Sequence, residues 1–304
     1  MKVLVIGATG FTGSHTVPAL RAAGHHLRCL VRPESVKRFV EKQPQVETVV
    51  GDLNDPKSVR HALVGMEAAI TIASIGFGHA PALVDCLCKS EVRRVLFVST
   101  TAIFTRLNSR SKAIRIAAES AIVNSGLDFT ILRPTMIYGG RRDRNISRLI
   151  RFLRWTPIVP VIGRGQRLQQ PIFVQNVADA LVACLDHPIT IGRCYNIAGA
   201  CPLTFNEIID TVCMEIGRRP AKLHLPLQPV VRFFQTMEKC GWHLPITSEQ
   251  FLRLAEDKAF DYTRAVADFG FSPMGFLDGV RRQLMDFKQG GIEKTSADRN
   301  QHHP

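Results

Sequence analysis

The first thirteen residues hold a short apolar run followed by three glycines, and this arrangement constrains the fold more than any other part of the chain. Lys2–Ile6 reads as a buried strand, and Gly7, Gly10 and Gly13 follow it at intervals of three residues. A helical pattern runs over Phe11–Ala23. A strand that ends in such glycines and opens a helix is typical of a loop that wraps around phosphate groups, because backbone N–H groups and the positive helix end then face the anion.

Each glycine has its own role in such a loop. Gly7 permits the tight turn, Gly10 removes a side chain that would block a pyrophosphate, and Gly13 lets the helix pack closely on the strand. The sequence therefore predicts a dinucleotide site at this turn. Its expected contacts are the three glycines together with Thr9, Phe11 and Thr12.

Strands and helices alternate through the first half of the chain. Strands are expected at Lys2–Ile6, His26–Val31, Glu47–Val50, Ala68–Ile72, Arg94–Val98 and Asp128–Leu132. Helical patterns lie between them at Phe11–Ala23, Pro33–Glu41, Pro56–Val64, Ala80–Ser90 and Ser109–Ser125. Apolar strands that alternate with helices predict an α/β fold of the Rossmann type, a doubly wound parallel sheet with its ligand at the carboxyl ends of the strands.

After Pro134 the pattern changes and helices dominate. They are expected at Asp143–Trp155, Val174–Asp186, Thr204–Ile216, Pro229–Cys240, Ser248–Ala259 and Phe276–Phe287, with short strands at Pro171–Phe173 and Tyr195–Ile197. We expect residues 1–135 to form the dinucleotide-binding core, joined by later elements from 171–200. Residues 136–288 are expected to form a smaller, mainly helical substrate or lid part, and 289–304 a flexible tail.

The composition narrows the class of protein and its partners. The formal net charge of +13 favours anionic partners such as phosphorylated ligands. The eight cysteines show no C-x-x-C spacing and no histidine placed as a zinc partner, which predicts reduced thiols, a cytoplasmic location and no metal site. The glycines end the first apolar run too early for a secretory signal, and the apolar stretch Ala68–Phe77 is too short to span a membrane.

The residue that follows the second strand distinguishes the two nicotinamide dinucleotides. Arg32 stands there, about 20 residues after the last glycine, which is the usual spacing, and Lys37 and Arg38 follow. A guanidinium suits bidentate contact with a ribose 2′-phosphate, so the sequence favours NADP(H) over NAD(H). Glu34 supports the alternative, because its carboxylate could bind a free 2′-hydroxyl and thus NAD(H). Arg32 would then be a solvated loop charge.

A second contact with the adenosine half is expected after the third strand. Gly51-Asp52-Leu53 ends that strand, and the Asp52 carboxylate and the Leu53 backbone could reach the adenine. Asp52 could instead cap the helix that begins near Pro56, since Asp is favoured before a helix start. Both interpretations stay open at this point.

Several motifs, taken in order, resemble short-chain dehydrogenases/reductases of the extended or atypical type. They are residues 7–13, 51–53, 98–101, 131–139, 171–174, 176–179 and 195–199, and the resemblance covers most of residues 1–285. The chain is similar in particular to the epimerase/dehydratase branch of this family, to NmrA-like regulators, and to the accessory subunit of respiratory complex I that resembles this family. The resemblance implies further cofactor contacts from Ala73, Ser99 and Pro134, and a homodimer formed through helices beside the sheet.

The chain departs from the catalytic pattern of that family. Active members carry a tyrosine and, four residues later, a lysine whose charge lowers the phenol pKa towards neutrality so that it can exchange protons. Alignment on Glu119 places Ser111 at the tyrosine position and Arg115 at the lysine position. No tyrosine occurs before residue 138. Arg115 can still hold the nicotinamide ribose, but no phenol stands beside it.

Two classes of function therefore remain open. The first is an NADP-linked oxidoreductase or epimerase/dehydratase with a rebuilt site, in which Lys112 supplies the acid/base group and Thr100 or Thr101 contacts a substrate oxygen. The second is a non-catalytic dinucleotide-binding sensor, regulator or assembly scaffold. In that case Lys112 is a solvated helix charge, and the two threonines close a strand end.

A basic segment follows the first half of the chain. Ile146, Leu149, Ile150 and Leu153 form an apolar stripe at helical spacing, and Arg144, Arg148 and Arg151 share another face. Three interpretations of the segment stay open. It forms a solvated basic face, or Arg141, Arg142 and Arg144 bind a phosphorylated substrate. In the third interpretation the segment contacts an anionic membrane peripherally and also uses Trp155. Nucleic acid is not favoured, because there is no recognition-helix motif.

Overall fold

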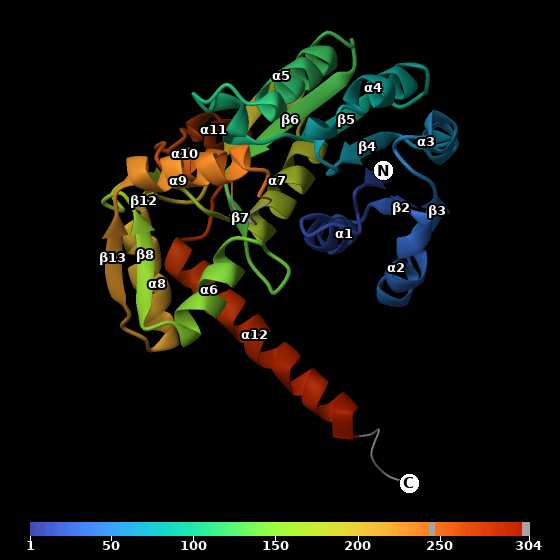
Figure 1. Cartoon of the computed structure of the whole chain (residues 1–304). Coiled ribbons are helices and arrows are strands. Elements are labelled where there is room, and N and C mark those ends of the chain that lie inside the picture. Colours follow the sequence, from blue (N-terminus) through green and yellow to red (C-terminus); the bar gives the residue numbers. More distant parts are fainter. Residues whose placement is uncertain (243–246, 300–304) are drawn as a thin grey trace. The chain divides into compact units, whose positions relative to one another are not determined.

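In the computed structural model, which describes residues 1–242 and 247–299, the chain divides into two compact units (Figure 1). Unit 1 comprises residues 1–135, 174–198 and 260–272. Unit 2 comprises residues 136–173, 199–259 and the chain from 273 onward. The chain thus returns twice to unit 1, and the second return, at 260–272, was not predicted because it contains only one short helix.

Unit 1 is built on one sheet of seven parallel strands. They are β1 (Lys2–Ile6), β2 (His26–Val31), β3 (Glu47–Val50), β4 (Ala68–Thr71), β5 (Arg94–Val98), β6 (Asp128–Pro134) and β11 (Arg193–Ile197). Their order across the sheet is β11-β6-β5-β4-β1-β2-β3. The predicted Rossmann-type doubly wound sheet is therefore confirmed. The strand order reverses between β1 and β4, which is where such sheets bind ligands.

Helices cover both faces of this sheet. They are α1 (Gly13–Ala22), α2 (Val36–Lys42), α3 (Pro56–Leu63), α4 (Ala80–Cys88), α5 (Arg110–Val123), α7 (Val174–Asp186) and α11 (Thr263–Phe269), with single turns η1 (Pro33–Ser35), η2 (Ile75–Phe77), η3 (Thr101–Phe104) and η4 (Pro188–Thr190). Helices α3, α4 and α5 pack side by side, and α1 packs against α7. Every residue of β4 and β5 is buried, as expected for strands covered on two sides.

Several polar groups buried in unit 1 are hydrogen-bonded to one another. Arg94, at the start of β5, donates to the hydroxyls of Thr130 (2.8 Å) and Thr190 (2.7 Å) and to the carbonyl of Asp128 (2.9 Å). On α11, the Asp268 carboxylate accepts from the Tyr195 hydroxyl at 2.7 Å and lies 2.9 Å from the Arg193 guanidinium. The Arg94 bonds tie β5 to β6 and η4, and the Asp268 contacts tie β11 to α11. Partners of this kind spare buried polar groups the cost of lost hydration.

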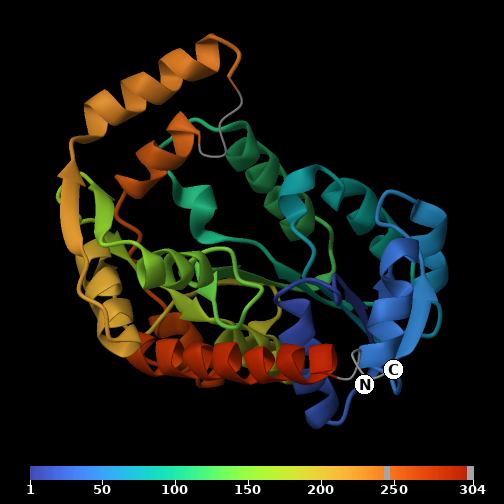
Figure 2. The ribbon, with the colours of Figure 1, turned by 60° about the horizontal axis from the view of Figure 1, so that its bottom comes forward.

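Unit 2 contains more strand than the sequence predicted. Its elements are β7 (Ile137–Tyr138), α6 (Ile146–Trp155), β8 (Ile158–Ile162), β9 (Leu168–Gln169), β10 (Ile172–Phe173), β12 (Leu203–Thr204), α8 (Phe205–Ile216), β13 (Ala221–Leu225), α9 (Leu227–Lys239), α10 (Ser248–Leu254) and α12 (Phe276–Arg299). The parallel pair β8–β13 was missed (Figure 2). Pro160 interrupts the strand pattern of β8, and proline is tolerated only where a strand leaves its N–H unpaired.

Two helix ends in unit 2 differ from the prediction. Helix α10 ends at Leu254 because the next residues pair elsewhere: the Asp257 carboxylate accepts the Leu168 N–H at 2.9 Å, and the Lys258 N–H donates to the Leu168 carbonyl at 2.8 Å. Helix α12 continues to Arg299, whereas a flexible tail was expected from residue 289. Glu293, Lys294, Ala297 and Arg299 favour a helix, although Gly290 and Gly291 precede them. The rest of the predicted tail, 300–304, lies outside the described residues.

Candidate dinucleotide-binding site

The glycine loop between β1 and α1 lies at the point where the strand order reverses. Gly7 has φ +93°, and a Cβ built on it would lie 2.6 Å from the backbone nitrogen of Ala73, two residues past the end of β4. A Cβ on Gly13 would lie 2.2 Å from the Gly7 carbonyl oxygen. Both positions therefore exclude any side chain, because real Cβ atoms do not approach so closely. The packing roles predicted for these two glycines agree with this geometry.

Gly10 is different, because little protein surrounds it. A Cβ there would have one close neighbour, the Gly7 carbonyl oxygen at 3.2 Å, and Gly10 is exposed. Among the described residues, none accepts a hydrogen bond from the backbone N–H groups of Phe11, Thr12 or Gly13. The loop thus combines open space at Gly10 with unpaired donors, which is the arrangement that a pyrophosphate requires.

The start of α1 is also electrostatically suited to an anion. Its first turn contains no acidic residue, and the N-cap residue Thr12 makes no side-chain cap hydrogen bond. The positive helix end is therefore not neutralised by a carboxylate of its own turn. This cradle fits a dinucleotide, whose negative pyrophosphate would lie over Gly10.

At the end of β2, the two candidates for the ribose contact form an ion pair with each other. The Arg32 Nε atom lies 3.1 Å from a Glu34 carboxylate oxygen, and both side chains are more than half exposed, at 62% and 61%. An exposed pair of this kind contributes little stability, so either partner is available to a ligand at small cost. The geometry keeps both NADP(H) and NAD(H) open at this position.

After β3, the residue that caps helix α3 is Asp55 and not Asp52. Asp55 caps α3 by accepting the Lys57 and Ser58 N–H groups at 3.0 and 3.2 Å. The interpretation of Asp52 as the cap is therefore wrong, because the cap position of α3 is Asp55, three residues further on. Asp52 instead accepts the Asn54 N–H at 2.8 Å in a local turn, and the partly buried Leu53 packs on the core of unit 1.

His79, which the sequence analysis did not single out, is influenced by the charge of Asp52. Burial lowers the pKa of His79, and the charge of Asp52 opposes that shift. Its Nε2 atom is buried and has no hydrogen-bond partner in the part of the chain that the structure describes. His79 stands at the N-terminus of α4, in the loop after β4. No spacing in the sequence could have indicated it, because its neighbour is 27 positions away.

Ser99, Thr100 and Thr101, which were predicted to contact the cofactor or a substrate, form hydrogen bonds within unit 1. The Ser99 hydroxyl donates to the Glu119 carboxylate, which also forms an ion pair with Arg133. Thr100 accepts the Ala102 N–H at 3.2 Å, so its side chain caps η3. The hydroxyl of Thr101 is buried and donates to the Pro134 carbonyl at 3.4 Å. Both threonine hydroxyls thus close the end of β5.

Helix α5 carries the residues that replace the family's tyrosine and lysine. Ser111 lies one turn before Arg115, which donates to the Ser111 carbonyl at 3.3 Å. A Cβ on Gly76 would lie 2.9 Å from the Arg115 Nε atom, so this guanidinium lies along the loop that follows β4. The Lys112 amine donates to the Thr105 carbonyl at 2.6 Å. Lys112 therefore ties α5 to the loop after η3 instead of standing free in solvent.

Two of the chain's three tyrosines lie in buried structural contacts. The Tyr138 hydroxyl, in unit 2, is enclosed against Gly279 and donates to the Phe276 carbonyl at 3.3 Å. Burial raises the pKa of Tyr138 well above its usual range. Burial and the bond to Asp268 do the same for the pKa of Tyr195. Neither phenol is suited to exchange protons near neutral pH.

The predicted substrate arginines precede α6 in unit 2. Arg141, Arg142 and Arg144 are exposed, and between them Asp143 is buried. The Asp143 carboxylate accepts the Asn145 N–H at 2.6 Å and the Ser147 N–H at 3.1 Å, which fixes the loop to the start of α6. That these arginines bind substrate stays a prediction.

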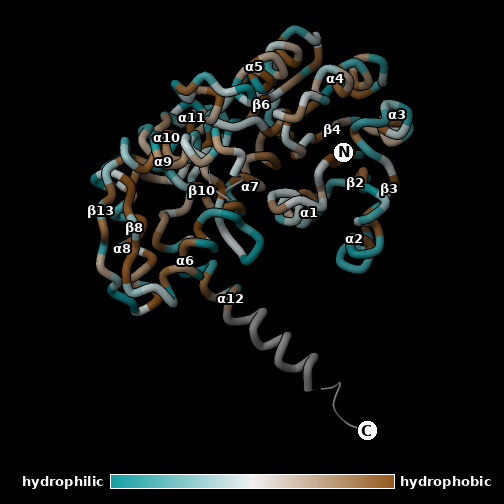
Figure 3. Tube along the Cα trace, in the orientation of Figure 1, coloured by the Kyte–Doolittle hydropathy of each residue, from teal (hydrophilic) through white to brown (hydrophobic). Residues whose placement is uncertain are grey.

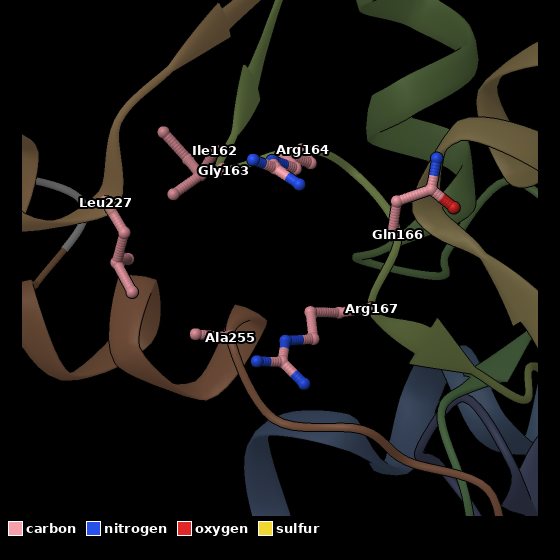
Figure 4. A pocket seen from close by; sticks show the side chains of 7 residues that line it. All are labelled: Ile162, Gly163, Arg164, Gln166, Arg167, Leu227 and Ala255. Carbon is pink, nitrogen blue, oxygen red and sulfur yellow. The ribbon is translucent and has the colours of Figure 1, made fainter.

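A separate pocket in unit 2 presents other arginines. It encloses about 300 Å³ and is lined by the loop after β8, by Leu227 of α9 and by Ala255. Figure 4 shows Arg164, Gln166 and Arg167 around this space. Arg167 lies 2.9 Å from the Asp257 carboxylate. Sequence reasoning missed this pocket, although the G-R-G-Q-R run at 163–167 combines turn glycines with two donors suited to a phosphate.

The described part of the chain holds no cluster of three or more His, Cys, Asp or Glu side chains placed to bind a metal ion. Within residues 1–242 and 247–299, no helix combines the length and the apolar character needed to cross a bilayer. All eight cysteines are free thiols.

Comparison with known proteins agrees with this site. The NAD(P)H-binding family matches residues 7–188. A ceramide reductase of Caulobacter vibrioides is 29% identical over 236 residues, which cover 74% of this chain and 73% of that protein. Subunit 9 of the mitochondrial NADH dehydrogenase 1 alpha subcomplex of Arabidopsis thaliana is 26% identical, with 73% of this chain and 60% of that one covered.

Solved structures share the fold. The crystal structure of a nucleoside-diphosphate-sugar epimerase from Pseudomonas aeruginosa superposes with a TM-score of 0.77 at 20% identity, covering 96% of this chain and 98% of the other. At that identity the likeness concerns the fold alone. The glycine cradle, the strand order and the match over 7–188 together show that the chain belongs to the NAD(P)H-binding family, within the atypical short-chain dehydrogenase/reductase superfamily.

Proposed function

We propose that this protein binds NADP(H) and uses the bound dinucleotide as a sensory or structural ligand, without tyrosine-dependent proton transfer. The observation that carries the proposal is the replacement on α5: a serine and an arginine stand where the superfamily has its phenol and its lysine. A serine hydroxyl does not ionise near neutral pH, so Ser111 cannot supply the proton exchange of the usual reaction. The cofactor cradle is retained, while the acid/base pair is not.

Arg115 keeps the binding half of that pair. Its guanidinium is a permanent cation that lies along the loop after β4, next to Gly76. It is therefore suited to donate hydrogen bonds to the nicotinamide ribose, as the lysine does in active members. The dinucleotide is able to supply hydride chemistry when bound, but the proposed sensory or structural role does not use it. The residues of unit 1 would bind and orient it.

A second candidate is an NADP-linked reductase with a different proton donor. The similarity to a protein named ceramide reductase, over three quarters of this chain, favours it. In that case a substrate carbonyl would accept hydride, and Lys112 or water would supply the proton. NADPH oxidation, followed by absorbance in the presence of lipid ketones, decides between the candidates. Substrate-dependent oxidation would establish the reductase and reject the non-catalytic proposal, and its loss in Lys112→Ala would assign the proton to Lys112 instead of water.

The preference for NADP(H) depends on Arg32. We expect Arg32→Ala to weaken NADPH binding by about tenfold or more, since one charge-assisted bidentate contact is lost, and to leave NADH binding unchanged. Glu34→Gln should strengthen NADPH binding, because it removes the carboxylate 3.1 Å from Arg32. Arg60→Ala, an exposed arginine on α3, is the matched control. Equal losses of NADPH and NADH affinity in Arg32→Ala would contradict the assignment.

A further inference from the structure

One end of unit 2 exposes large apolar side chains beside arginines. We define the basic-aromatic tip by its exposed members: Phe152 and Trp155 of α6, Met214 of α8, and Arg148, Arg151, Arg218 and Arg219. Trp155 is 86% exposed, Met214 63% and Phe152 43%. Isolated apolar residues on a surface need no explanation, but a group of this size does.

These residues belong to one continuous surface. The end of α6, the end of α8 and the starts of β8 and β13 lie together at one end of unit 2, as Figures 1 and 2 both show. Thr156 and Pro157 line the same cavity, of about 890 Å³, as Met214, Arg218 and Arg219. The Ala221 N–H donates to the Pro157 carbonyl at 2.9 Å, which fixes the two segments beside each other.

Helix α6 presents this surface because its apolar stripe faces the other way. Ile146, Ile150 and Leu153 are buried in the core of unit 2, as the sequence predicted. Arg148, Arg151, Phe152 and Trp155 follow at three- and four-residue spacing on the exposed face. The colouring of Figure 3 shows hydrophilic and hydrophobic residues alternating along α6.

The positive charge of the tip is not neutralised by its own neighbours. The nearby carboxylates are already paired, Asp210 with Lys222 at 2.7 Å and Glu215 with Arg281 at 3.1 Å. Among the described residues, no carboxylate lies within 4.0 Å of the guanidinium groups of Arg148, Arg218 or Arg219. The net charge of +13 adds a long-range attraction for anions.

We propose that the basic-aromatic tip docks on the surface of an anionic phospholipid bilayer. Trp155, Phe152 and Met214 would enter the boundary between headgroups and acyl chains, where an indole prefers to lie. The arginines would bind lipid phosphates and would attract the unit to negative headgroups. This inference concerns unit 2 and is independent of dinucleotide binding in unit 1.

The fluorescence of Trp155 tests this proposal directly. The chain has two tryptophans, so a Trp242→Phe background leaves Trp155 as the only reporter. Vesicles of phosphatidylcholine with phosphatidylglycerol should shift its emission to the blue, and vesicles of phosphatidylcholine alone should not. About 0.5 M salt should reverse the shift, because it shortens the Debye length to a few ångströms.

A pair of charge-matched variants makes the test specific. In the same background, Arg218→Gln with Arg219→Gln should weaken vesicle binding about 30-fold, since each basic residue at an anionic surface contributes roughly a fivefold factor. Arg60→Gln with Arg93→Gln removes the same charge from exposed positions of unit 1 and should change binding little. Equal loss in both pairs, an absent shift, or a shift caused by oligonucleotides and not by vesicles would overturn the proposal.

Discussion

Gly10→Ala is expected to weaken NADPH binding by at least about tenfold, because a methyl group would occupy space that the pyrophosphate needs. The fold should tolerate the change. Its Cβ would lie 3.2 Å from the Gly7 carbonyl oxygen, a contact that a small shift relieves, and Gly10 does not have a positive φ. Titration of nicotinamide fluorescence measures the affinity, and a thermal melt measures the stability.

Gly13→Ala provides the contrast, since its Cβ would lie 2.2 Å from the same oxygen and 2.7 Å from the Ala8 Cα atom. Such overpacking costs about 1–3 kcal/mol or more, so this variant should melt at a clearly lower temperature. If Gly10→Ala loses NADPH binding but keeps its stability, while Gly13→Ala loses stability, the space above Gly10 is where the ligand binds. NADPH affinity equal to that of the wild type in Gly10→Ala would reject the cradle.

Glu119→Ala is expected to destabilise unit 1 by about 3–5 kcal/mol, because removing one partner of a buried ion pair leaves the other charge uncompensated. The Glu119 and Arg133 side chains are only 8% and 19% exposed, and the Arg133 Nε atom is 3.1 Å from both carboxylate oxygens. The variant also deprives the Ser99 hydroxyl of its acceptor. Urea unfolding of the variant and the wild type measures the difference.

The double variant Glu119→Leu with Arg133→Met separates the ion pair from general packing. Apolar side chains of similar volume can replace a buried pair at little cost, so this protein should recover most of the lost stability. A double variant as unstable as the sum of the two single changes would show that the contacts matter through shape and not through charge. The guanidinium of Arg133 also lies 5.4 Å from the centre of the Phe104 ring, so a part of the loss should persist.

The fold of unit 1 was predictable because its strands and helices have strong local patterns. Strands β1, β2, β3 and β5 match their predicted bounds. Each is followed by a glycine or a polar residue and contains several Val, Leu or Ile residues. In unit 2 the strands are short, and two pairs have only two residues in each strand. Pairs of that length have no period that a sequence can reveal, because they depend on contacts made elsewhere in the fold.

The candidate site was predictable only where its function depends on backbone geometry. The spacing of the three glycines indicated the turn between β1 and α1, because that turn admits no side chain at two of the three positions. By contrast, the hydrogen bonds of Ser99 with Glu119 and of Lys112 with Thr105, and the electrostatic influence of Asp52 on His79, join separate elements. Ser99 and Glu119 are 20 positions apart, and Asp52 and His79 are 27 positions apart. Whether side chains at such separations interact depends on how the loops after the strands pack. The sequence could name such side chains but not their partners.

The central claim is that the cradle between β1 and α1 binds NADP(H), and titration of the purified protein with NADPH and with NADH tests it most directly. We expect saturable enhancement of nicotinamide fluorescence with NADPH, and affinity for NADH lower by about tenfold, consistent with one 2′-phosphate contact. No saturable change with either dinucleotide would contradict the account, and the glycine loop would then be a structural turn only.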